Sequence, residues 1–122
     1  MTLDRLPQIE GFDFDYALEI FQDEEILKVI LVDFYYSLDE LCEKLNGLFD
    51  AIGDGDNLSL YRLEVHALKS TSASVGALLI SEQAKQLEMA ATKQDMQVIR
   101  IKHPLLIEDI MKHKGHLAKI IS

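Results

Sequence analysis

One histidine in this chain, His66, has neighbours that suit chemistry at its imidazole ring. Lys69 follows it by about one helical turn, residues 70–74 are all small, and Gly76 comes shortly after them. Small residues leave an imidazole uncovered on one side, and a lysine one turn away places a positive charge beside the ring. This combination suits a ring nitrogen that carries an anionic group, and it suits a buried histidine poorly.

A helix through this region places His66 on its outer face. At about 100° per residue, its neighbours within about 60° are polar or small except for Leu63 at the edge: Ser59, Arg62, Lys69, Ser70 and Ala73. The far side carries apolar residues that we expect to face the core: Tyr61, Val65, Leu68 and Val75. Side chains on a helix lean towards its N-terminus, so the residues able to cover His66 are Lys69 and Ser70. Ser70 is too small to hide the ring.

A carboxylate is predicted to reach His66 from the following helix. If the chain turns near Gly76 and Ala77, His66 and Glu88 each lie eleven residues from position 77. At about 1.5 Å per residue the two are level. Glu88 can then accept a hydrogen bond from Nδ1–H, which fixes the tautomer and leaves Nε2 free. The same count puts Lys85 level with Lys69, in a positive rim; a solvated charged face is the other interpretation of Glu88 and Lys85.

Helical patterns fill the chain, and no strand pattern or repeat is found. The predicted helices span 13–21, 23–49, 58–75, 77–91 and a last segment that ends near 120. In the second, apolar residues recur at alternating steps of four and three, as in the seam of a helical bundle: Leu27, Leu31, Phe34, Leu38, Leu41, Leu45 and Leu48. These patterns predict an all-α fold, an antiparallel up-down-up-down four-helix bundle in one domain of residues 1–122, with a short additional N-terminal helix across one end.

Several residues are predicted to shape the helix ends. Asp56 or Asn57 can cap the third helix, and Gly76 can end it in a left-handed conformation. Residues 92–95 (Thr-Lys-Gln-Asp) resemble a capping box for the last helix. Pro104 should kink that helix or mark a join, because proline removes one helical hydrogen bond.

The overall composition excludes several classes of function. A net charge of −9 argues against nucleic-acid and anionic membrane partners. With Cys42 as the single cysteine, no internal disulfide forms, and Cys42 is expected to be a helical packing residue. No signal peptide or membrane-spanning segment is recognisable. We therefore expect a cytoplasmic monomer.

The remaining histidines are predicted to be structural. His103 precedes Pro104, and His113 and His116 lie near several lysines at a basic helix end, an arrangement that suits the helix dipole better than a metal ion. The sequence has no Glu-x-x-His pair, which removes the di-iron bundle. No metal site is expected in this chain.

The segment 66–77 resembles the signature of histidine-containing phosphotransfer (HPt) domains of multistep phosphorelays. The matching residues keep fixed offsets from one histidine: His66, Leu68, Lys69, Ser70, Thr71, Ser72, Val75, Gly76 and Ala77. Leu87 and Glu88 look like the family's Leu-Glu pair on the next helix. The likeness extends to the apolar second helix, whereas the first helix and the tail carry no signature. Ser70 departs from the commoner glycine but is small enough to be allowed.

The resemblance implies a phosphocarrier rather than an enzyme. Nε2 of His66 would accept a phosphoryl group from a receiver-domain aspartyl phosphate and pass it to another receiver aspartate, with Lys69 stabilising charge and Glu88 orienting the ring. The expected partners are response-regulator receiver domains, a hybrid sensor histidine kinase, or both. The chain has no phosphate loop for ATP. It is expected to bind no cofactor itself, and Mg²⁺ would sit on the partner receiver.

The second helix has more apolar residues than one seam can bury: Ile26, Val29, Ile30, Val32, Tyr35 and Tyr36. Some must face the short first helix. The remainder would form an exposed patch beside His66 that suits a receiver, unless all of them belong to the core.

Two other functions fit the same residues. The chain could be the phosphoacceptor domain excised from a larger hybrid or chemotaxis-type histidine kinase, phosphorylated directly by an ATP-binding domain. It could also be an adaptor that binds receivers without chemistry, in which case replacing His66 would change nothing.

Overall fold

The computed structural model describes residues 6–53 and 57–121, and within them every regular element is a helix. The five helices are α1 (Phe14–Phe21), α2 (Glu24–Asp50), α3 (Asn57–Ser74), α4 (Leu78–Thr92) and α5 (Met96–Ala118). The predicted all-α class is confirmed, and the predicted bounds of α2, α3 and α4 are each within one residue of the observed ones.

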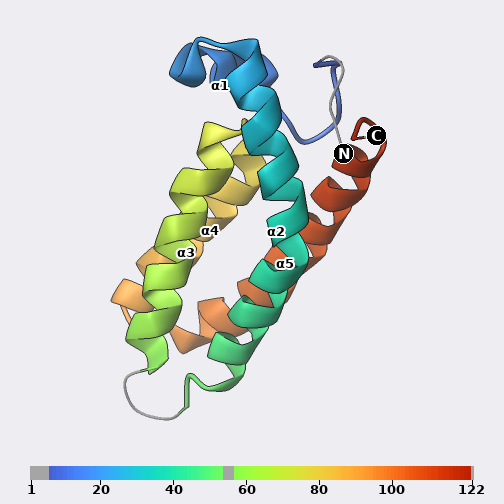
Figure 1. Ribbon diagram of the computed structural model, residues 1–122. Coiled ribbons are helices and arrows are strands. Elements are labelled where there is room, and N and C mark those ends of the chain that lie inside the picture. Colours follow the sequence, from blue (N-terminus) through green and yellow to red (C-terminus); the bar gives the residue numbers. More distant parts are fainter. Residues whose placement is uncertain (1–5, 54–56, 122) are drawn as a thin grey trace.

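The four long helices pack around a shared core (Figure 1). α2 contacts α3 and α5, and α4 contacts the same two helices, so the four close into a ring. Successive long helices run in opposite directions, and the short α1 lies at the end where α3 passes into α4 (Figure 1). α1 contacts α2 and α3 only.

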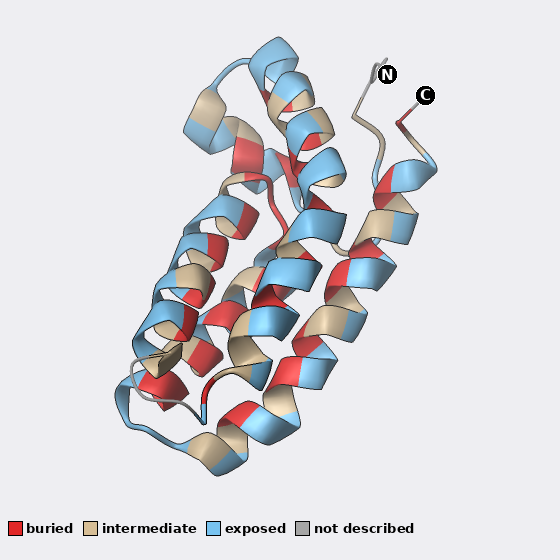
Figure 2. Ribbon diagram, turned by 60° about the horizontal axis from the view of Figure 1, so that its bottom comes forward, coloured by how far each residue is buried: buried red, intermediate tan, exposed pale blue. Residues whose placement is uncertain are grey.

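Buried residues follow the inner stripe of each long helix (Figure 2). On α2 the buried stripe is Leu27, Leu31, Phe34, Leu38, Cys42 and Leu45. The predicted seam was therefore wrong at two positions, because Leu41 and Leu48 are only half-buried and Cys42 takes the core place. Cys42 is the buried packing residue that the sequence predicted.

Two of the exposed apolar residues of α2 lie far along the helix from His66. Ile26, Val29 and Tyr36 are exposed. Lys44 of α2 pairs with Glu64, which precedes His66 on α3 by two residues. Lys44 therefore lies at about the same height along the bundle as His66. At about 1.5 Å per residue, Val29 is then roughly 20 Å from that height and Ile26 farther still. The predicted patch beside His66 is wrong for these two residues.

Gly76 fixes how α1 meets the rest of the bundle. It adopts a φ of +82°, as predicted for the end of the third helix. Its carbonyl accepts a hydrogen bond of 2.8 Å from the backbone N–H of Asp13, the N-cap of α1. A Cβ at position 76 would collide with the Asp13 carbonyl. Glycine is therefore required both by the left-handed backbone and by this close approach.

The predicted capping box before α5 is wrong. Asp95 caps the helix by accepting from the backbone N–H of Val98, while the Thr92 hydroxyl donates back to the carbonyl of Glu88 inside α4. Pro104 lies within one continuous α5, so it marks no join. Asn57 is the first residue of α3, and its amide donates to the Ala51 carbonyl. The predicted cap at Asp56 lies outside the described residues.

Candidate functional site

His66 lies in the middle of α3 and faces solvent, as the angular positions of the residues around the helix predicted. The four apolar residues of the opposite face are all buried: Tyr61, Val65, Leu68 and Val75. The His66 side chain is 55% exposed. Among the described residues only Glu88 hydrogen-bonds the ring, through Nδ1, so Nε2 remains open to an incoming group.

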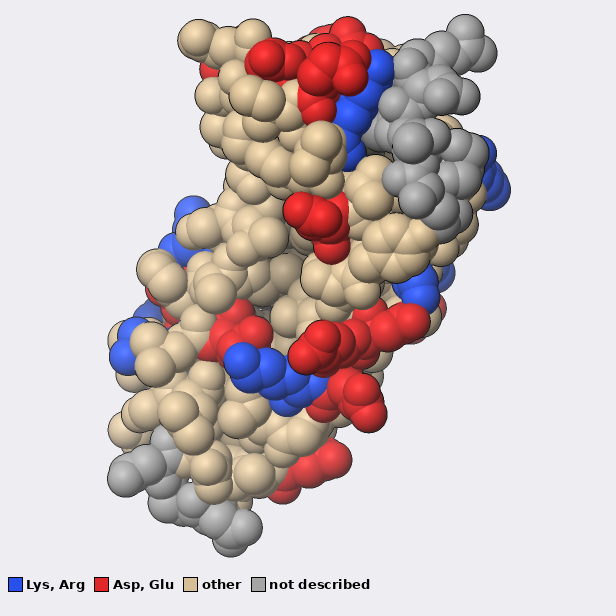
Figure 3. All heavy atoms as spheres, in the orientation of Figure 1, with Lys and Arg blue, Asp and Glu red and all other residues tan. Residues whose placement is uncertain are grey.

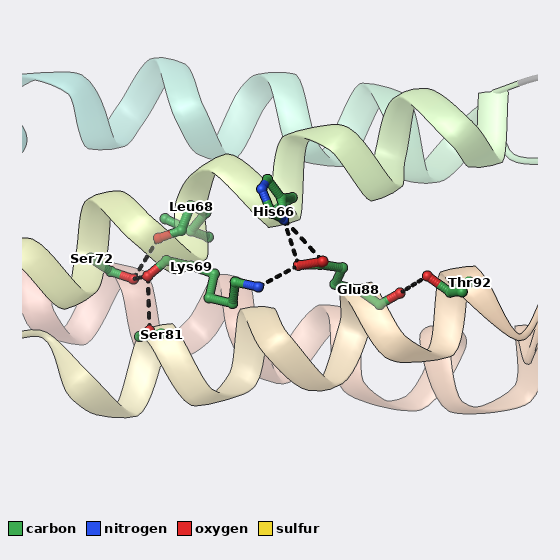
Figure 4. Close-up of polar contacts among 7 residues, drawn as sticks. All are labelled: His66, Leu68, Lys69, Ser72, Ser81, Glu88 and Thr92. Atoms are coloured by element: carbon green, nitrogen blue, oxygen red, sulfur yellow. Dashed lines mark hydrogen bonds and ion pairs between the residues drawn. The ribbon is translucent and has the colours of Figure 1, made fainter.

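Glu88 on α4 holds the His66 ring from behind (Figure 4). Nδ1 of His66 lies 2.9 Å from Oε1 and 3.0 Å from Oε2 of Glu88, which confirms the predicted hydrogen bond. A carboxylate only accepts, so Nδ1 carries the proton and Nε2 has the free lone pair. Burial alone would raise the pKa of Glu88, but hydrogen bonds from His66 and Lys69, together with the charge of Lys69, outweigh it and lower that pKa. Glu88 is therefore ionised at neutral pH.

Lys69 makes an ion pair that the sequence analysis did not predict. Its Nζ lies 3.0 Å from Oε2 of Glu88, so one carboxylate binds both the lysine and the histidine (Figure 4). Lys69 still lies beside the ring, with its side chain 31% exposed. Lys85 is exposed and forms no ion pair with the described part of the chain, and its place in a positive rim stays a prediction. Ser70 is exposed and Arg62 is half-buried.

A shallow groove separates α2 from α3 next to the histidine. It has a volume of about 230 Å³ and an apolar floor formed by Phe34, Leu41 and Leu68. Lys44 and Glu64 also line it and pair at 3.0 Å. Figure 3 shows basic and acidic side chains against each other midway along this face. Glu64 of α3 thus faces α2.

Hydroxyl groups around the site form bonds that the sequence analysis missed. Ser81 Oγ donates to the carbonyl of Lys69 at 2.8 Å, from α4 to α3. A signal was present in the spacing, because Ser81 precedes Glu88 by seven residues and so lies on the same face of α4 within about 20°.

The other histidines take structural places. His103 is buried and bonded on both ring nitrogens, as expected for a structural residue. His113 is buried too, with Nδ1 donating to the Asp109 carbonyl. His116 lies 3.6 Å from Glu10. Within residues 6–53 and 57–121, no three His, Cys, Asp or Glu side chains gather as metal ligands would. No helix in this part of the chain is long and apolar enough to cross a membrane.

Comparison with known proteins identifies the class. The family model of the Hpt domain matches residues 29–112, which is more than half of the chain and includes the whole of α3 and α4. The chain belongs to the Hpt domain family. Hpt domains are phosphocarriers rather than kinases, and the chain has a histidine phosphotransfer role in phosphorelays.

One solved structure resembles the chain over most of its length. It is the crystal structure of histidine-containing phosphotransfer protein B (HptB) from Pseudomonas aeruginosa PAO1. The two share 26% sequence identity over 88% of each chain, with a TM-score of 0.63. A search among curated protein sequences found no match.

Proposed function

We propose that His66 is the phosphoacceptor and that the chain relays a phosphoryl group between the aspartates of two receiver domains. The observation that carries this proposal is the hydrogen bond between an exposed ring and a largely buried carboxylate. His66 donates from Nδ1 to Glu88, and Nε2 faces solvent. The family membership supports the reaction class, and the geometry supports the choice of nitrogen.

In the proposed step, the Nε2 lone pair attacks the phosphorus of an aspartyl phosphate in line with the departing carboxylate. The N–P bond forms as the P–O bond to the aspartate breaks, and the carboxylate leaves with the electron pair. The ring gains positive charge because Nδ1 keeps its proton, and the ionised Glu88 stabilises that charge. The reverse sequence delivers the group to the next aspartate.

Lys69 is proposed to stabilise the negative charge of the transferred phosphoryl group. Its ammonium is held beside the ring by Glu88 at 3.0 Å. A phosphoryl group on Nε2 brings about two negative charges, which a neighbouring ammonium group would stabilise. The Mg²⁺ that assists phosphoryl transfer is proposed to bind to the partner receiver, and this chain is proposed to hold no cofactor.

The test is to incubate the chain with a phosphorylated receiver and follow the acid-labile label. Wild-type protein should take the label and His66→Gln should take none, whereas an adaptor would keep its function in that variant. A parallel incubation with a kinase core and ATP tests the alternative of a kinase phosphoacceptor domain. Label arriving only from the kinase core would overturn the relay and support that alternative.

A second variant tests the open approach to the ring. Ser70 is exposed on the turn that follows His66. Ser70→Phe places a bulky side chain over the imidazole and should block transfer without unfolding the bundle. Transfer at the wild-type rate in this variant would contradict the proposed access to Nε2.

A further inference from the structure

Ser81 differs from the other hydrogen-bonded serines and threonines of α3 and α4. Thr71, Ser72 and Thr92 return their hydroxyl protons to a carbonyl four residues earlier in the same helix, at 2.9, 2.5 and 3.0 Å. This is the usual bond of a serine or threonine inside a helix. Ser81 instead donates across the helix interface, to the carbonyl of Lys69 at 2.8 Å. Within residues 6–53 and 57–121, it is the one α4 side chain hydrogen-bonded to the α3 backbone.

The bond from Ser81 closes a ring of contacts around the site (Figure 4). On α3, the carbonyl of Lys69 accepts from Ser81, and the ammonium of the same residue pairs with Glu88. On α4, Glu88 follows Ser81 by two turns, about 10.5 Å along the axis, and accepts from His66. Lys69 is therefore held at both ends by α4, and the sliding of one helix past the other is restrained at the level of the site.

Sliding of α4 along α3 matters because the hydrogen bond between His66 and Glu88 depends on the relative position of the two helices. The distances from Nδ1 to Oε1 and Oε2 of Glu88 are 2.9 and 3.0 Å. A shift of about 2 Å along the helix axis would lengthen both contacts, which run across the helix interface, to about 3.5 Å, beyond ordinary hydrogen-bond range. On the buried side, α3 and α4 are held together by packed apolar residues such as Leu68 and Leu87, whereas the edge that carries the 55% exposed His66 is held by polar contacts.

We infer that Ser81 is a positioning residue for phosphoryl transfer: its hydrogen bond to the Lys69 carbonyl helps to hold α4 against α3, at the exposed edge of the interface, in the register at which Glu88 bonds Nδ1 of His66. This inference rests on the proposed function of His66, and it adds a residue that touches neither the ring nor the transferred group.

The experiment compares Ser81→Ala with Ser74→Ala. Ser74 offers a matched loss of one hydroxyl, because its bond to the Thr71 carbonyl stays within α3. Ser81→Ala should slow transfer from a phosphorylated receiver about threefold to tenfold, the equivalent of one lost hydrogen bond. It should also shift the His66 ring towards the other tautomer in nitrogen NMR spectra. Ser74→Ala should change neither, and Ser81→Thr, which retains the hydroxyl, should restore both.

The outcomes separate the inference from the proposal beneath it. An unchanged tautomer signal in Ser81→Ala overturns the positioning role, even if the rate falls through a general loss of stability. If wild-type protein accepts no phosphoryl group from any receiver, the proposed function fails, and the tautomer comparison still decides whether Ser81 positions Glu88.

Discussion

His66 and His103 are both hydrogen-bonded through Nδ1 and yet have opposite surroundings. His66 is 55% exposed, and its one partner is the ionised Glu88. His103 is 2% exposed, and both its ring nitrogens have neutral partners at 2.8 Å: Nδ1 accepts from the Tyr61 hydroxyl and Nε2–H donates to Asn46 Oδ1. The environment, and not the imidazole, decides which histidine is available for chemistry.

The buried histidine is held as a neutral ring. Burial lowers the pKa of His103 to about 4, an effect that the charge of Asp50 only partly offsets. Phe49 stacks parallel to the ring with centroids 4.1 Å apart. Both ring nitrogens of His103 are hydrogen-bonded, one to Tyr61 of α3 and the other to Asn46 of α2, so the residue connects these helices to α5. No nitrogen of this ring is left for a substrate. At His66 the second nitrogen is left open, and the first lies 2.9 Å from the carboxylate of Glu88.

The largest expected effect separates the two histidines by function. His66→Gln should abolish the acid-labile phosphoryl label completely, because the nucleophile is gone. His103→Gln should retain the label at 10 °C and pH 7, provided that circular dichroism shows a folded bundle. Label that persists in His66→Gln would place the phosphoacceptor elsewhere.

Acid should destabilise the buried cluster around His103. The folded-state pKa of His103 is about 4, below the ordinary value of 6.5, so the unfolded chain binds more protons between these values. The contribution to stability is complete above pH 6.5 and is lost as the pH falls towards 4. The loss is about 3 kcal/mol, at 1.36 kcal/mol per pKa unit.

Urea unfolding at a series of pH values measures this loss. In His103→Gln, as a control, this part of the pH dependence between pH 6.5 and 4 should be absent. Direct NMR titration gives an independent check, since the His103 ring should stay neutral until the pH is close to 4. A His103 that titrates near 6.5 would contradict the description of the buried cluster.

A smaller effect is expected from removing the charge behind His66. Glu88→Gln keeps an acceptor oxygen but loses the negative charge that stabilises the ring cation, and it should slow transfer about tenfold. Glu82→Gln is the matched control, because Glu82 is an exposed residue of the same helix, and its transfer rate should equal that of wild type. Equal rates in the two variants would show that Glu88 has no role in transfer.

The smallest effect tests whether the exposed site contributes to folding. His66→Gln should change the free energy of unfolding by no more than about 0.5 kcal/mol, as surface substitutions do. Tyr61→Phe should cost about 1–3 kcal/mol, because it leaves Nδ1 of the buried His103 without a donor. Urea unfolding at pH 7 measures both, and similar costs for the two variants would remove the energetic distinction between the clusters.

The wrong prediction on α2 has a geometric cause. At about 100° per residue, Leu41 and Leu48 trail Leu27 by about 40° and 60° around the helix, whereas Leu45 returns to the same angle. A strict seven-residue pattern therefore drifts off the buried stripe, and Cys42 takes the place predicted for Leu41. Leu41 faces the groove between α2 and α3 instead.

The sequence by itself determined the features that depend on local periodicity: the helices, the outward face of His66, and the match in height between His66 and Glu88 across a short turn. Rise and angle per residue are nearly constant in a helix, so counting suffices for these. Only the tertiary structure decided the ion pair of Lys69 with Glu88, the bond from Ser81 to the Lys69 carbonyl and the buried partners of His103. These depend on side-chain rotamers and on the axial offset between packed helices, which contacts across the whole core select.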